Sequence, residues 1–128
     1  MNRALYHAAC ALAANGLVVL RGLVDDTFAA AGGLRAGDAR VLADALMQVA
    51  VASTGEHGAT AALSGPVRRG DATTVRRHLQ AIGAEVPHAV GAYRALMFGA
   101  LRLARAAGLS TAAAATVASV LAADEGEG

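Results

Sequence analysis

The sequence predicts an all-α protein built as an irregular bundle of five or six helices, the first of them unusually long. Three observations support this fold class. Apolar residues make up 55% of the 128 residues but aromatic residues only 3%, so the apolar content is mostly Ala, Leu and Val, and Ala is the strongest helix former. Apolar residues recur at helical spacing. No segment shows sustained period-two alternation, so we expect little or no sheet.

The first helix is predicted from Asn2 to about Ala31, because this stretch has no proline and its apolar residues recur every three or four positions. Gly16 in its middle costs about 1 kcal/mol relative to Ala, and we expect it to mark a close packing contact or a slight bend. Gly32 and Gly33 end the helix.

The second helix is predicted to start at Gly37-Asp38, where the Asp38 carboxylate can cap the first turn. The segment 53–58 is expected to interrupt it, and a short helix or turn follows at 59–63. The predicted buried face of the second helix comprises Val41, Leu42, Ala45, Leu46 and Val49.

Three further features complete the bundle. Asp71 caps a helix that runs to about Ile82 and ends at Gly83. After Pro87 a central helix, apolar nearly all round, runs from 88 to about 107. Ser110 caps the last helix, 111–123. We therefore predict a single domain over residues 1–123 and a flexible acidic tail over 124–128.

Charge and cysteine usage exclude several classes of protein. A net charge of +1 gives no general attraction to nucleic acid. Cys10 is the single cysteine, so no intrachain disulfide can form, and we expect a reducing, cytoplasmic setting. The apolar run 8–24 contains Asn15, Gly16 and Arg21 and lacks a cleavage-site pattern, so we expect neither a signal peptide nor a membrane span.

The first helix carries polar side chains, His7 and Asn15, that could contact a substrate. In a regular helix, residues eight positions apart lie about 80° apart around the axis and about 12 Å apart along it, so the two could line one groove without touching. His7 is the candidate for proton transfer. The alternatives are a structural histidine and an asparagine that makes hydrogen bonds between packed helices.

The segment 64–71 is the most distinctive local sequence. Pro66 fixes the backbone, Gly65 and Gly70 permit unusual dihedral angles, and Arg68 or Arg69 could hold a carboxylate or phosphate. Arg69 could equally pair with a nearby acidic residue. The alternative is a structural turn with Asp71 as a helix cap. His57, His78 and His88 are interpreted as structural or exposed, and Tyr93 as a core residue. The sequence has no phosphate loop, no dinucleotide fingerprint and no zinc-ligand spacing.

The sequence resembles the C-terminal helical domain called DUF2520. The resemblance is carried by three stretches: Leu5-Tyr6-His7-Ala8-Ala9 followed by Asn15, the segment from Leu63 to Leu79 with its Gly-Pro and Arg-Gly-Asp elements, and Tyr93-Arg94-Ala95-Leu96. In that family the helical domain follows a Rossmann-like domain and is similar to the C-terminal domains of 6-phosphogluconate dehydrogenase, ketopantoate reductase and pyrroline-5-carboxylate reductase.

The resemblance implies a substrate-cleft and dimerisation domain of an NAD(P)-dependent oxidoreductase that is inactive alone. It implies that NAD(P) binds mainly to an N-terminal Rossmann domain absent from this chain, and that the chain forms a homodimer. His7 would be catalytic, while Asn15, Gly65, Pro66 and Arg69 would contact a small-molecule substrate. A Lys common in several relatives is missing. The alternative is a non-enzymatic helical module that binds another protein; the substrate, the cofactor preference and the reaction direction stay open.

Overall fold

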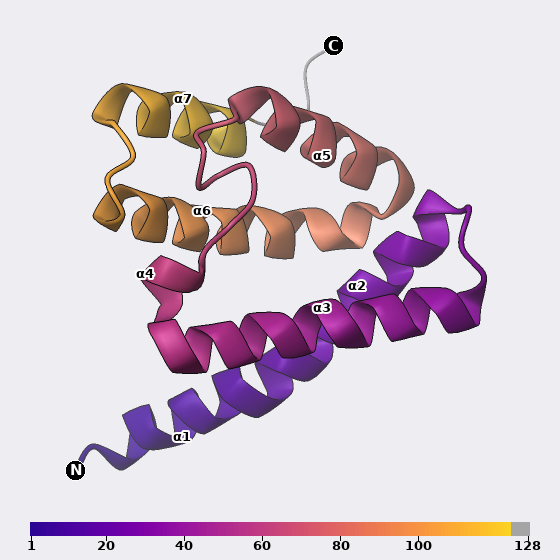
Figure 1. The fold of residues 1–128 in the computed structure, drawn as a ribbon, viewed down its shortest axis with the longest axis horizontal. Coiled ribbons are helices and arrows are strands. Elements are labelled where there is room, and N and C mark those ends of the chain that lie inside the picture. The colour runs from indigo at the N-terminus through magenta and orange to yellow at the C-terminus, as the bar shows by residue number, and fades with distance from the viewer. Residues whose placement is uncertain (124–128) are drawn as a thin grey trace. The chain divides into compact units, whose positions relative to one another are not determined.

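The computed structural model describes residues 1–123, whose regular elements are all helices, with no strand in that range (Figure 1). The predicted all-α class and the long first helix are confirmed. The predicted tail 124–128 lies outside the described residues. The chain divides into two compact units, Met1–Leu46 and Met47–Gly128, and each is described by itself. The prediction of a single domain stays a prediction.

The first helix of the unit Met1–Leu46 has three parts: α1 (Arg3–Ala11), a π-helical turn η1 (Leu12–Gly16) and α2 (Leu17–Ala31). The Asn2 side chain caps it by accepting hydrogen bonds from the amides of residues 4 and 5. Gly32 and Gly33 follow it with φ of 68° and 77°, a conformation that favours glycine, so the predicted end is confirmed. At Gly16 the irregularity is a widened turn with the residue exposed, and no close packing contact is found.

Helix α3 (Ala36–His57) runs across the boundary between the units and corrects three predictions. It begins before Asp38, which lies in the first turn and pairs with Arg35. It continues through 53–58, where the Thr54 hydroxyl donates to the Ala50 carbonyl at 2.7 Å, and Gly58 with φ of 80° follows its end. The predicted buried face is wrong: all five of its members are exposed, and Ala43 is the buried residue of α3.

The unit Met47–Gly128 holds the main hydrophobic core. Its helices are α4 (Ala59–Ala62), α5 (Ala72–Glu85), a short 3₁₀ turn η2 (Pro87–Ala89), α6 (Val90–Ala106) and α7 (Thr111–Ala122). Helices α5, α6 and α7 pack against one another (Figure 1). The core comprises Val67, Val75, Leu79, Ala100, Leu101, Ala104, Ala114, Val117, Val120 and Leu121. These residues are mostly alanine and valine, so each contact removes little apolar area from water.

Both predicted helix caps in this unit are confirmed. The Asp71 carboxylate accepts from the Thr74 amide at 3.0 Å, and the Ser110 hydroxyl accepts from the Ala113 amide at 3.2 Å. Helix α5 continues through Gly83 to Glu85, because the chain does not turn until Val86, whose backbone leaves the helical region before Pro87. Helix α6 buries one face only, since Leu96 and Phe98 are 47% and 42% exposed.

Candidate functional site

The π-helical turn decides how the two candidate residues of the first helix lie. A π turn inserts one extra residue into the helix, which cancels about 100° of rotation. Most of this turn, Leu12–Gly16, lies between His7 and Asn15. The rotation around the helix axis from His7 to Asn15 therefore equals that of about seven residues in a regular helix. The two side chains then point in directions about 20° apart. The two side chains share one face, where regular helical geometry predicts about 80° between them.

Both side chains on this face are open to solvent, as are all residues from 1 to 19. The His7 ring contacts the Tyr6 ring with centroids 5.8 Å apart and planes tilted by 56°. Asn15 makes no helix-packing hydrogen bond to another helix of the described chain. A polar amide and an imidazole on one exposed face, about 12 Å apart along the axis, can bind two separate hydrogen-bonding groups of a ligand.

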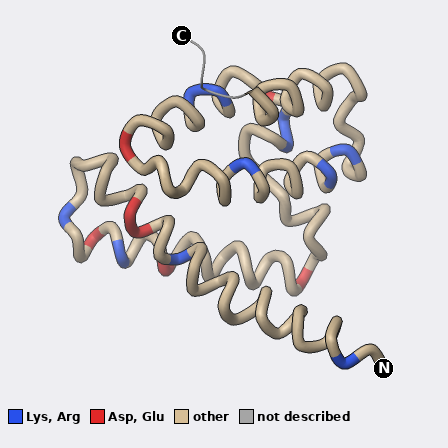
Figure 2. The backbone as a smooth tube through the Cα atoms, turned by 180° about the vertical axis from the view of Figure 1, so that it is seen from behind, with Lys and Arg blue, Asp and Glu red and all other residues tan. Residues whose placement is uncertain are grey.

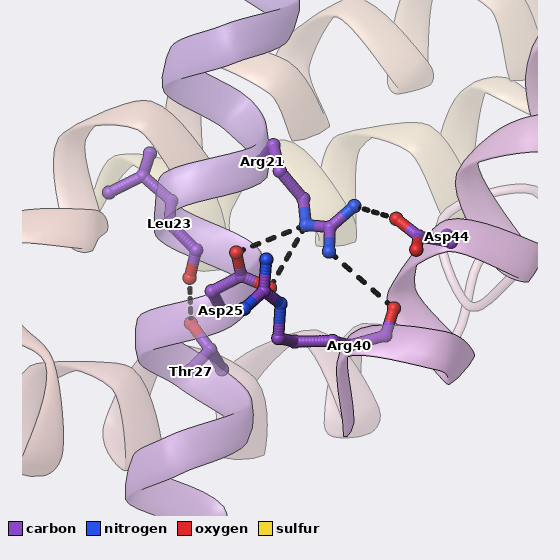
Figure 3. A network of polar contacts seen from close by, with 6 residues as sticks. All are labelled: Arg21, Leu23, Asp25, Thr27, Arg40 and Asp44. Atoms are coloured by element: carbon purple, nitrogen blue, oxygen red, sulfur yellow. Dashed lines mark hydrogen bonds and ion pairs between the residues drawn. The ribbon is translucent and has the colours of Figure 1, made fainter. Parts of the chain in front are cut away.

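The first half of α2 is joined to α3 by an Arg21 network (Figure 3). The Arg21 Nε donates to both Asp25 oxygens at 2.9 and 3.1 Å, one Nη pairs with Asp44, and the other donates to the Arg40 carbonyl at 3.5 Å. The hydrogen bonds to Asp44 and Asp25 raise the pKa of Arg21. Arg21 thus fixes α2 beside α3 within the unit Met1–Leu46.

The segment 64–71 forms a compact turn. The Pro66 carbonyl accepts from the amides of Arg69 and Asp71 at 3.2 and 2.9 Å, and the Val67 carbonyl accepts from the Gly70 amide at 3.1 Å. Val67 is 2% exposed and anchors the turn in the core. These bonds show the structural turn and helix cap that the sequence offered as one interpretation.

The side chains of this turn divide between structure and solvent. Arg68 donates to the Ala107 carbonyl at 3.4 Å, near the end of α6, while Arg69 is exposed. Hydrogen bonds from the Thr74 hydroxyl, at 2.6 Å, and from the Thr74 amide lower the pKa of Asp71, and nearby Arg69 adds to this effect. Asp71 is therefore held as a cap, and the exposed Arg69 side chain lies near enough to stabilise its charged form.

The predicted site residues fall in different units. His7 and Asn15 belong to Met1–Leu46, whereas Gly65, Pro66 and Arg69 belong to Met47–Gly128. The structure brings His7 and Asn15 onto one face and holds Gly65, Pro66 and Arg69 in one turn. That both groups line a common cleft stays a prediction.

Sequence reasoning missed two polar features of the second unit. His78 Nδ1 and the Tyr93 hydroxyl lie 2.9 Å apart and link α5 to α6, and burial raises the pKa of Tyr93. Arg94 donates to the Leu121 carbonyl at 2.6 Å and so satisfies the end of α7. Both pairs join residues distant in sequence, so no local pattern could indicate them.

A pocket of about 260 Å³ lies between α5, α6 and the end of α7. Its polar lining comes from Arg76, Gln80, Arg94 and Ser119. None of the predicted site residues lines it. Because Arg94 already satisfies the carbonyl end of α7, its charge is partly offset there by the negative end of the helix dipole.

Residues 1–123 hold no candidate metal centre and one candidate membrane span. No group of three or more His, Cys, Asp or Glu side chains is placed there to hold a metal ion. One helix, Arg3–Ala31, is long and apolar enough to cross a membrane by length and composition, with a mean hydropathy of 1.5 in its most apolar window. A signal sequence or a helix of a soluble protein meets the same criterion, so the expectation of no membrane span stays a prediction.

Comparison with known proteins gives one match. No curated protein and no solved structure matches the chain. Residues 1–100 match the family described as "Domain of unknown function (DUF2520)". The matched range covers the first helix, the turn at 64–71 and most of α6. Because it spans well over half of the sequence, this chain belongs to the DUF2520 family.

Proposed function

We propose that this chain is the C-terminal substrate-cleft and dimerisation domain of an NAD(P)-dependent oxidoreductase and is not catalytic alone. In this proposal a separate Rossmann domain binds NAD(P), and the first helix forms a wall of the substrate cleft. The observation that carries it is the π turn, which places His7 and Asn15 on one exposed face. Such turns occur frequently at functional sites, where they redirect a side chain at a cost in helix regularity.

His7 is the proposed proton-transfer group, and Asn15 is the proposed donor and acceptor that orients the substrate. In this proposal the two domains enclose the His7 imidazole and exclude water from the proton transfer. In the same proposal Gly65 and Pro66 shape the turn, and exposed Arg69 meets an anionic group of the substrate. The chemistry of hydride transfer belongs to the nicotinamide cofactor.

The test begins with the coding sequence upstream of Met1. We expect it to encode a strand, a glycine-rich turn and a helix that bind a dinucleotide. In calorimetry the two-domain protein should bind NADPH or NADH, and this chain alone should bind neither. Tight binding by this chain, or an upstream region without the fingerprint, would contradict the proposal.

The role of His7 is tested in the two-domain protein once a carbonyl substrate is found by NAD(P)H oxidation. His7→Gln should lower kcat/KM by about 100-fold or more, the usual contribution of a general acid or base. His57→Gln is the matched control, because the His57 side chain is 56% exposed and meets only its neighbour Glu56 at 3.6 Å. Equal rates for both variants would remove His7 from the mechanism.

A second function, a non-enzymatic module that binds another protein, is favoured by the exposed apolar side chains of Met1–Leu46. The large ones are Leu5, Tyr6, Leu12, Leu17, Val18, Val19, Leu34, Val41, Leu42 and Leu46. Exposed apolar surface of this extent is typical of an interaction surface. The same upstream sequence separates the two functions, since only the oxidoreductase requires a dinucleotide fingerprint.

A further inference from the structure

The surplus positive charge of the chain lies in the unit Met47–Gly128. The unit Met1–Leu46 carries four Arg and four Asp, so its formal charges cancel. Residues 47–123 carry seven Arg against three acidic residues, a net charge of +4 (Figure 2). An excess of one sign attracts ions of the opposite sign, most strongly where it lines a concave surface. An anion is therefore the ligand to expect in a pocket of this unit.

Two of these arginines line such a pocket. Arg76 of α5 and Arg94 of α6 lie in the wall of the pocket of about 260 Å³ between α5, α6 and the end of α7. No Asp or Glu among the described residues lines it. By contrast, Arg69 and Arg77 lie near Asp71 and stabilise its charged form. The two guanidinium groups of the pocket thus have no carboxylate beside them in its wall.

The pocket has an apolar floor and a polar rim. Leu79 and Val120 line its base, are 3% and 7% exposed, and belong to the hydrophobic core. Arg76 and Gln80 stand one helical turn apart on the same side of α5, where both side chains are exposed. Because the lining residues sit on three packed helices, the positions of these polar groups are fixed by regular structure.

Both guanidinium groups keep hydrogen-bond donors that no other residue uses. Nη1 of Arg94 donates to the Leu121 carbonyl at 2.6 Å, while its Nε and Nη2 make no bond to any residue from 1 to 123. Arg76 makes no hydrogen bond or ion pair within the same range. A guanidinium presents its N–H donors as a flat fork, which matches two oxygens of a phosphate or carboxylate.

The rim also supplies neutral donors. On α7 the Thr116 hydroxyl donates to the Ala112 carbonyl at 3.1 Å, the usual bond of a hydroxyl inside a helix. The Ser119 hydroxyl, which lines the pocket, makes no such bond within residues 1–123, and neither does the Gln80 amide. A hydroxyl and an amide can each donate to an oxyanion that the arginines attract.

We propose that this pocket is an oxyanion site, charged and sized for a phosphate group that Arg76 and Arg94 hold, with Gln80 and Ser119 as neutral donors. A phosphate ester carries about −1.5 to −2 charges at pH 7, which two guanidinium groups balance. The negative end of α7 opposes the anion only weakly, because Arg94 already bonds to its Leu121 carbonyl. A volume of about 260 Å³ suits a small ligand.

This site goes beyond the proposed oxidoreductase function and does not depend on it. None of the residues proposed to contact the oxidoreductase substrate lines the pocket. A bound phosphate would bridge three helices whose core consists largely of alanine and valine, where each contact removes little apolar area from water. A ligand that binds only the folded chain raises its stability as the ligand concentration rises. The unit Met47–Gly128 should therefore gain stability from phosphate.

Nuclear magnetic resonance of the whole chain, titrated with inorganic phosphate at constant ionic strength, tests the site. In wild type the amide signals of the lining segments should shift and saturate. Arg76→Gln should weaken binding by about 10-fold or more, the usual contribution of one charge-assisted hydrogen bond. Arg102→Gln is the matched control, because it removes the same charge from exposed α6 surface outside the pocket. Shifts that do not saturate, or equal affinity in the two variants, overturn the proposal.

A second variant distinguishes two sources of the oxyanion. Asp124, Glu125 and Glu127 follow Ala123, which lines the pocket, and their carboxylates offer the same kind of acceptor as phosphate. Phosphate binding that is no tighter after Asp124→Asn, Glu125→Gln and Glu127→Gln together supports a free phosphate compound as the ligand. Tighter binding in this variant supports the same site with the chain's own carboxylates as its oxyanion. Absence of saturable binding in both proteins overturns the site and leaves the oxidoreductase proposal intact.

Discussion

Replacing Gly70 with alanine should destabilise the unit Met47–Gly128 through two separable effects. Gly70 has φ of 70°, a conformation that costs other residues about 1–2 kcal/mol. An added Cβ would also lie 3.1 Å from both the Ala113 Cβ and the Leu109 Cδ1. Such contacts are too tight, and shifting well-packed neighbours costs about 1–3 kcal/mol. We expect Gly70→Ala to lower the free energy of unfolding by about 2–5 kcal/mol.

Gly108→Ala is the matched control, because Gly108 also has a positive φ, 101°, in the turn that ends α6, but its added Cβ would meet nothing within 4 Å. This variant should lose only the conformational part, about 1–2 kcal/mol. Urea unfolding followed by circular dichroism, at one fixed protein concentration, measures both. Equal losses in the two variants would show that Gly70 is not required by close packing against α7.

Three further predictions concern the polar contacts. The folded pKa of Asp71 is depressed below its ordinary value of 3.8, so the stability it contributes is present above that pH and lost as pH falls through the folded pKa. In Asp71→Asn the free energy of unfolding should therefore fall less steeply as the solution is acidified. An unchanged dependence on acid pH would argue against the cap. Tyr93→Phe removes the bond to His78, so urea unfolding should show a loss of about 0.5–1.5 kcal/mol, whereas no loss would show that this contact is not formed in solution. Arg21→Met removes the bonds to Asp44 and Arg40, so hydrogen exchange of the α3 amides near these two residues should become faster. The control is Arg102→Met, on the exposed surface of α6, where the same amides should exchange at the wild-type rate. Similar exchange in both variants would count against the network.

The sequence alone determined the helical class, the long first helix and the ends marked by local chemistry. Asp71, Ser110 and the glycines at 32 and 33 act through their own backbone or the next few residues, so their signals are local and readable. The π turn was not readable: Gly16 indicated an irregularity in the helix, but its type depends on which carbonyl each amide meets. The sequence could thus indicate His7 and Asn15 as candidate residues, but it could not show that the two side chains share one face of the helix.

Only the tertiary structure decided what is buried and which distant groups meet. The face of α3 that the periodicity marks as apolar is exposed within this chain, because periodicity shows which side of a helix is apolar and not what covers it. The His78–Tyr93 and Arg94–Leu121 contacts depend on how α5, α6 and α7 pack. Local sequence chemistry therefore set the helices and their caps, and packing between helices set the core, the Arg21 network and the uncovered face of the first helix.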